Sequence, residues 1–145
     1  MENNQRHKGH PISRLTAHIV WVTKYRYKVI DGEIKIRCRS LIKQICDAED
    51  VVILSGVVSS DRVHLHIDYL PSKAISDMVK RIKGRTSRRI QEEFPHKSKK
   101  YWGRHFWATG FGVWSTGNIT DEMVQRYLEH HRAPDNNNDN VIILE

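Results

Sequence analysis

Two histidines separated by one residue stand in the stretch DRVHLHIDYL. If this stretch is a strand, His64 and His66 lie on one face, because side chains alternate between the two faces. Val63, Leu65 and Ile67 then lie on the other face, which is apolar and suited to the core. Imidazole is the commonest metal ligand in proteins, so the histidine pair could form half of a metal site. A polar strand face that carries histidines by chance is the alternative.

A tyrosine and a histidine near the C-terminal end of the chain have helical spacing. In the stretch MVQRYLEHH, Tyr127 and His131 are four residues apart and share a helix face. A lone tyrosine at such a position usually packs against a sheet. Together with the histidine pair, however, His131 could complete a three-histidine site for a divalent cation. The Tyr127 hydroxyl could then reach whatever the cation polarises.

Such a set of groups is suited to phosphodiester cleavage. A metal would act as a Lewis acid on the scissile phosphate, and the tyrosine oxygen would attack phosphorus as a covalent nucleophile. The protein would keep a 5′-phosphotyrosine and release a 3′-OH, so that strands could be rejoined without a nucleotide cofactor. The sequence contains no Walker-type glycine-rich loop.

The net charge of +7 is concentrated in one part of the 145-residue chain. Residues 71–105 contain 11 Lys/Arg and 3 Asp/Glu, a net of +8, which suggests a polyanionic partner. A solvated helix face is the alternative. Because the apolar runs are far shorter than a membrane span, we expect a nucleic acid and no membrane as the partner.

The cysteines and the first residues indicate a cytoplasmic protein. Cys38 and Cys46 are too far apart to form a disulfide if they share a helix, at about 12 Å from a rise of 1.5 Å per residue. They are therefore expected to be small core residues in a reducing compartment. The first 15 residues have no apolar core of the kind found in a signal peptide.

The hydrophobic periodicity predicts an α+β domain with the order β-α-β-β-α-β-α. This is the ferredoxin-like, split βαβ plan: a four-stranded antiparallel sheet with two helices on one face, plus a C-terminal helix that carries Tyr127. The histidines would point onto the other, open face. The domain is expected at 16–132, between a flexible N-terminus (1–15) and a tail (133–145). Strands are predicted at 16–25, 51–60, 61–70 and 106–116, and helices at 33–49, 73–94 and 121–132.

In this order and at this spacing, five stretches resemble the single-tyrosine HUH transposases of small bacterial and archaeal insertion sequences. They are HIVWVTKYRYKVI, DRVHLHI, KRIKGRTSRRI, YWGRHFWATGFGVWST and QRYLEHH. The resemblance covers about residues 16–132. It implies a metal-dependent DNA strand transferase that cleaves and rejoins single-stranded DNA at insertion-sequence ends.

The resemblance also implies roles for individual residues. His64 and His66 correspond to the two metal ligands of the HUH motif, and Tyr127 corresponds to the nucleophile. The third ligand of the family is usually a glutamine, and His131 occupies its position. A third imidazole would shift the preference from Mg²⁺ towards Mn²⁺ or softer ions. Asp61 stands just ahead of the motif, as a further group that could lie near the metal.

For substrate and assembly, the resemblance implies DNA hairpins and a homodimer. The tyrosine helix of one subunit would lie against the histidines of the other, with residues 117–120 as the hinge. Tyr101 and Trp102 could stack on unpaired bases. The candidates for phosphate contacts lie on the basic helix: Lys80, Arg81, Lys83, Arg85, Arg88 and Arg89.

Two other functions remain open at this stage. One is a ferredoxin-like nucleic-acid-binding module without catalysis, which would explain the basic helix and the aromatic residues. It would not explain Tyr127 and His131 at helical spacing beside a histidine pair. The other is a domesticated HUH nuclease that acts on chromosomal repeats. The residues themselves do not separate it from a transposase.

Overall fold

The computed structural model describes residues 15–97, 105–115 and 121–131. Tyr101, Trp102, the expected hinge at 117–120 and the tail at 133–145 lie outside the described residues, as does nearly all of the N-terminal segment.

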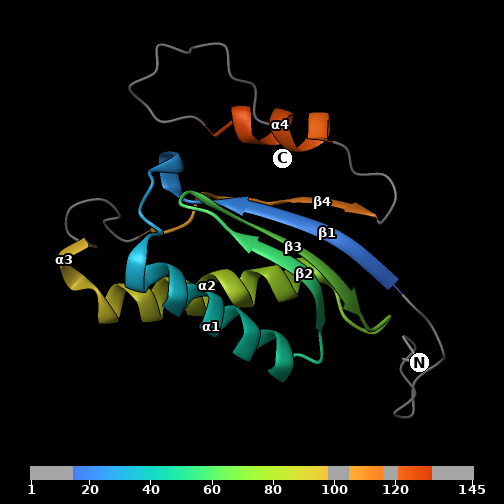
Figure 1. Cartoon of the computed structure of the whole chain (residues 1–145). Coiled ribbons are helices and arrows are strands. Elements are labelled where there is room, and N and C mark those ends of the chain that lie inside the picture. The colour runs from blue at the N-terminus through green and yellow to red at the C-terminus, as the bar shows by residue number, and fades with distance from the viewer. Residues whose placement is uncertain (1–14, 98–104, 116–120, 132–145) are drawn as a thin grey trace.

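Four strands form one antiparallel sheet, as the sequence predicts (Figure 1). Their order across the sheet is β2-β3-β1-β4, so the first and third strands lie in the middle, as in the ferredoxin-like plan. β1 pairs with β3 on one side and β4 on the other, and β2 is an edge strand. The strands are β1 (Leu15–Val22), β2 (Val52–Val58), β3 (Arg62–Tyr69) and β4 (Gly112–Ser115).

The two long helices, α1 (Gly32–Ala48) and α2 (Ile75–Glu93), cover one face of this sheet (Figure 1). The last helix, α4 (Asp121–Glu129), lies on the opposite face. The sequence predicts that this face is open, and this is wrong, because α4 covers part of it. Two single turns, η1 (Lys24–Arg26) and α3 (Pro95–Lys97), complete the helical elements of the described residues.

The main core lies between the sheet and the helices α1 and α2. It follows the strand alternation, since Val63, Leu65 and Ile67 of β3 are each at most 3% exposed and belong to it. Cys38 and Cys46 of α1 are buried free thiols in the same core, as expected. No helix in the described part of the chain has the length and apolar character needed to cross a bilayer.

The fourth strand is much shorter than predicted. The expected strand begins at 106, but β4 begins at Gly112. Phe106 and Trp107 fill the core from an irregular segment, and the backbone at Gly110 has φ of +88°, which favours glycine. Lys83 of α2 donates to two carbonyls of this segment, that of Ala108 at 2.9 Å and that of Gly110 at 2.8 Å. The segment still touches the sheet, because Trp107 forms a single bridge with Thr23 and the Ala108 N–H donates to the Val22 carbonyl oxygen at 2.9 Å. The Lys83 contacts lie at the break between this bridge and β4.

Candidate active site

The histidine pair lies on β3, on the sheet face that α4 partly covers. His64 and His66 are both half-buried, and a third imidazole joins them from β1. The strand register places His18 directly opposite His66, and the two rings are stacked with centroids 4.1 Å apart. Nδ1 of His18 lies 3.2 Å from Nε2 of His64, at hydrogen-bond distance. We call His18, His64 and His66 the three-histidine cluster.

The surroundings of His64 and His18 favour the neutral form of each imidazole. Burial lowers the pKa of His64, and the neighbouring charges of His66 and Arg62 lower it further. The pKa of His18 is also lowered, first by burial and then by His66 and His64. Neutral rings keep a nitrogen lone pair available, which is the form that binds a metal.

His18 is absent from the residues that sequence reasoning selected. The stretch LTAHIVWV does carry a usable signal, because alternation puts Ala17, Ile19 and Trp21 on the core face and His18 on the other. What the sequence does not provide is the register between β1 and β3, which makes His18 the neighbour of His66.

Tyr127 lies on α4 and faces the sheet. Its side chain is 5% exposed and packs in a second small core with Leu128 and with Val20 and Val22 of β1. The Trp114 ring of β4 lies edge-on, with its centroid 6.3 Å from that of Tyr127. The tyrosine is therefore on the same side of the sheet as the three-histidine cluster, but packing covers its ring.

His131 follows Tyr127 by one helical turn, as the sequence predicts. The two ring centroids are 4.7 Å apart, and Nδ1 of His131 lies 3.2 Å from the Tyr127 carbonyl oxygen. Within residues 15–97, 105–115 and 121–131, no group of three or more His, Cys, Asp or Glu side chains is arranged to hold a metal ion. The structure thus keeps His131 beside Tyr127 rather than with His64 and His66, and the predicted three-ligand site remains a prediction.

Asp61 has structural partners for both carboxylate oxygens. Oδ2 accepts hydrogen bonds from Arg26 at 2.9 and 2.8 Å, and Oδ1 accepts one from Arg62 at 3.0 Å. The Asp61 side chain is 4% exposed, so two guanidinium groups compensate its buried charge. Both carboxylate oxygens are therefore bound by arginines. Asp61 could bind a metal only after at least one of these arginine contacts is broken.

Arg26 connects this aspartate to the helix that carries the tyrosine. Its remaining guanidinium nitrogen donates to the Leu128 carbonyl oxygen, in the last turn of α4, at 3.0 Å. Tyr25 and Arg26 have φ of 57° and 56°, a left-handed conformation that costs side-chain-bearing residues of order 1–3 kcal/mol each. The contacts of Arg26 hold it in that conformation and link α4 to the residue just before β3.

The basic residues of α2 lie on the opposite side of the sheet from the histidines (Figure 1). Arg81 makes a two-pronged contact with Glu49, at 2.9 and 3.0 Å, and Lys83 holds the 106–111 segment. Of the other basic residues of α2, Arg89 makes an ion pair with Glu93 at 3.5 Å, while Lys80, Arg85 and Arg88 make none within the described part of the chain. Three of them line a depression of about 260 Å³ between α1 and α2: Arg85, Arg88 and Arg89.

Comparison with known proteins identifies the family. The family described as "Transposase IS200 like" matches residues 11–131. The ISDra2 transposase TnpA of Deinococcus radiodurans is 29% identical over 118 residues, which are 81% of this chain and 84% of the relative. The transposase for insertion sequence element IS200 of Salmonella typhimurium is 30% identical over 118 residues, covering 81% and 77% of the two chains.

Solved structures agree with this result. A crystal structure of a Deinococcus radiodurans transposase superposes with a TM-score of 0.80 at 29% identity, over 89% of this chain and 98% of the other. A REP-associated tyrosine transposase bound to a REP hairpin has the same fold, with a TM-score of 0.55 at 14% identity, over 89% and 71% of the two chains. The match over residues 11–131 and the 30% identity decide the assignment: this chain belongs to the IS200-like transposase family.

Proposed function

We propose that this transposase cleaves and rejoins single-stranded DNA at insertion-sequence ends, with Tyr127 as the nucleophile. The observation that carries the proposal is the placement of Tyr127 on α4, which packs on the same sheet face as His64 and His66. Family membership supplies the reaction class, since the relatives are transposases. A binding module without chemistry would have no need for this combination.

The reaction is a transesterification in two halves. The Tyr127 oxygen forms a bond to phosphorus, loses its proton, and displaces the 3′ oxygen, which takes up a proton. The 5′-phosphotyrosine retains the energy of the broken bond, so a second 3′-OH can attack it and release the tyrosine. Because the Tyr127 ring is 5% exposed in this structure, DNA must displace α4 or turn the phenol before the attack.

A divalent cation, Mg²⁺ or Mn²⁺, would be held by His64 and His66, and His131 would join them when α4 shifts. The chemistry of the donors fits, because two neighbouring imidazoles share a strand face and the pKa of His64 is lowered by burial. Bound there, the ion would supply Lewis-acid polarisation of the scissile phosphate. An all-imidazole set favours Mn²⁺ over Mg²⁺.

DNA hairpins are the proposed recognition element. A REP-associated tyrosine transposase of the same fold binds a REP hairpin, which supports this substrate class for the fold. Phosphate contacts would come from the exposed basic positions of α2. Arg85 and Arg88 are the best placed, because they line the depression between α1 and α2 and have no ion pair in the described part of the chain. Lys80 flanks them, while Arg81, Lys83 and Arg89 would first have to leave their present partners.

The proposal is tested by trapping the covalent product. Labelled single-stranded oligonucleotides from both flanks of the element are incubated with protein and Mn²⁺ and separated on denaturing gels. We expect a strand-specific protein–DNA adduct that disappears in Tyr127→Phe but persists in Tyr25→Phe, which alters an exposed tyrosine. Tight hairpin binding without any adduct would instead support a module without catalysis. Adducts on chromosomal repeats alone would support a domesticated nuclease.

A further inference from the structure

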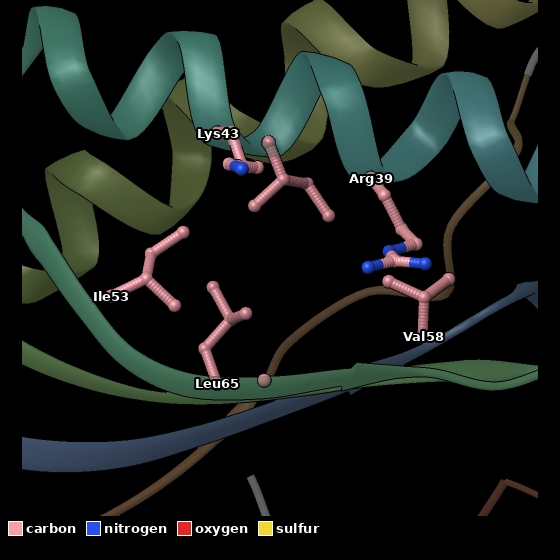
Figure 2. Close-up of a pocket in the computed structure, with 7 residues that line it drawn as sticks. Arg39, Lys43, Ile53, Val58 and Leu65 are labelled. Carbon is pink, nitrogen blue, oxygen red and sulfur yellow. The ribbon is translucent and has the colours of Figure 1, made fainter.

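A depression of about 270 Å³ lies between α1 and the edge strand β2 (Figure 2). It is on the helical side of the sheet, away from the three-histidine cluster, and none of the candidate active-site residues lines it. Its lining comes from α1, β2 and the neighbouring β3: Arg39, Ile42, Lys43, Ile53, Gly56, Val58 and Leu65.

The walls of this depression are apolar and belong to the core. Ile42 and Leu65 are 2% and 3% exposed, so their positions are fixed by packing rather than by solvent. The space exists partly because residue 56 is a glycine. A Cβ at Gly56 would lie 2.9 Å from Cδ2 of Leu65, so a larger residue would push that side chain into the space.

Two cations stand at the mouth of the depression. Arg39 and Lys43 are one turn apart on α1, and Figure 2 shows the Arg39 side chain reaching towards Val58 on the sheet wall, while Lys43 is seen end-on beside α1. Among the described residues, neither cation has a hydrogen bond or ion-pair partner, and the lining contains no acidic residue. Their neighbour Arg37, by contrast, makes a two-pronged contact with Glu93 at 2.8 and 3.0 Å.

We propose that this groove binds one nucleotide of an unpaired DNA segment, with the base against the apolar wall and the phosphate at Arg39 and Lys43. A volume of about 270 Å³ is slightly below the range of about 300–1,000 Å³ for small-molecule pockets, so the depression has room for one base, with the phosphate outside at the two cations. The guanidinium of Arg39 can bind phosphate with two parallel hydrogen bonds. An apolar ligand alone would not explain the two cations, and a bare phosphate would not explain the apolar wall.

The position of the groove is consistent with a path for DNA on the helical side. α1 separates this groove from the depression lined by Arg85, Arg88 and Arg89, so both flanks of one helix carry cations beside apolar side chains. A single strand that crosses α1 could therefore place phosphates on both. The proposal concerns binding only, and it stands or falls independently of the role of Tyr127.

Methyl NMR of the full chain tests the proposal with thymidine 5′-monophosphate as the probe. We expect millimolar nucleotide to shift the methyl signals of Ile42, Ile53 and Leu65, while thymidine or inorganic phosphate alone produces much smaller shifts. The double variant Arg39→Ala/Lys43→Ala should weaken the affinity by roughly tenfold or more, since charge-assisted hydrogen bonds are lost. The charge-matched control Lys28→Ala/Lys35→Ala should bind as wild type.

Three results would overturn the proposal. The first is the absence of methyl shifts with the nucleotide at millimolar concentration. The second is the same affinity in Arg39→Ala/Lys43→Ala as in wild type, which would place binding elsewhere. The third is an equal response to inorganic phosphate, which would reduce the site to a simple anion contact. Signals from core methyls distant from the groove report whether the variants remain folded.

Discussion

The three imidazoles of the candidate site hold one another in place. His18 contacts His64 through ring nitrogens 3.2 Å apart and stacks on His66 with an interplanar angle of 5°. A metal ligand usually depends on such outer contacts for its orientation. His18 therefore matters to the proposed metal site even if it never touches the ion.

We predict that His18→Ala weakens Mn²⁺ binding by about 10–100-fold, the usual effect of removing a group that orients a ligand. The reason is that His64 loses a hydrogen-bond partner and His66 loses its stacked neighbour, so both rings can rotate. Isothermal titration calorimetry measures the affinity. His96→Ala, which removes an exposed histidine of α3, should bind as wild type. An unchanged or raised affinity in His18→Ala would show that the contact does not support the site.

The two cysteines give a prediction for the pH dependence of a chemical reaction. Burial raises the pKa of Cys38 to about 12 and, with Asp47 and Glu49, that of Cys46 to about 11. At pH 8 the thiolate fractions are then roughly 10⁻⁴ and 10⁻³, compared with about a quarter for a free thiol. Alkylation by iodoacetamide should be very slow in the folded protein, accelerate as the pH rises, and become fast in urea. Rapid labelling of the folded chain at pH 8 would contradict this burial.

At the residue scale, the sequence predicts what depends on periodicity and misses what depends on register. Alternation correctly places His64 and His66 opposite the core face, and helical spacing correctly places His131 beside Tyr127. It does not reveal His18, whose role needs the alignment of β1 with β3. Nor does it reveal that Asp61 accepts a hydrogen bond from Arg26, which lies 35 positions away in the chain.

At the scale of elements, α4 depends on its contacts with the rest of the molecule. A helix of 9 residues is marginal on its own in water, so packing must stabilise it. Val20 and Val22 supply the apolar part of that contact, and Arg26 supplies a polar part at the Leu128 carbonyl. A cation at the C-terminal end of a helix also interacts favourably with the helix dipole.

We predict that Arg26→Ala loosens α4 without unfolding the sheet. Loss of a charge-assisted hydrogen bond costs about 1.5–3 kcal/mol, which corresponds to roughly 10–100-fold faster amide exchange in a helix held by that contact. Hydrogen–deuterium exchange should show the acceleration in 121–131, with the amides of β1 and β3 still slow. Arg37→Ala, which breaks an exposed arginine–glutamate contact on the far side of the sheet, is the control. Equal protection of α4 in both variants would rule out this role for Arg26.

Elements with long, regular patterns were predictable, and the fourth strand was not. α1 and α2 follow their apolar periodicity closely. The segment from 106 to 116 is aromatic and glycine-rich, so its composition suggests a strand throughout. Phe106 and Trp107 instead reach the core where the pairing with the end of β1 is reduced to a single bridge at Trp107, and Lys83 binds two carbonyls in the break that follows. The apolar stripe of α4 also does not say which sheet face it covers, since both faces offer apolar residues.

At the scale of the whole molecule, the candidate chemistry and the basic residues of α2 lie on opposite sides of the sheet. The three-histidine cluster and Tyr127 are on the α4 side, and the basic residues of α2 are on the other (Figure 1). One DNA molecule that uses both sides must therefore pass around an edge of the sheet, or contact the two sides on different subunits. The second arrangement would suit the proposed homodimer.

The proposed exchange of α4 between subunits can be tested by mixing two inactive variants. His64→Ala retains the tyrosine, and Tyr127→Phe retains the histidines. If the helix of one subunit completes the site of the other, a co-refolded mixture should regain DNA adducts, all on the His64→Ala chain. The same mixture should stay inactive if each chain uses its own α4, which is the packing seen in this structure.

The central claim is that Tyr127 forms the covalent bond to DNA, and peptide mass spectrometry tests it most directly. Protein is reacted with single-stranded DNA from the element ends and Mn²⁺, digested with nuclease and protease, and analysed for nucleotide-bearing peptides. We predict one modified peptide, with a 5′-linked nucleotide on Tyr127. A nucleotide on any other residue, or unmodified Tyr127 in protein that binds the same DNA tightly, would contradict the proposed mechanism.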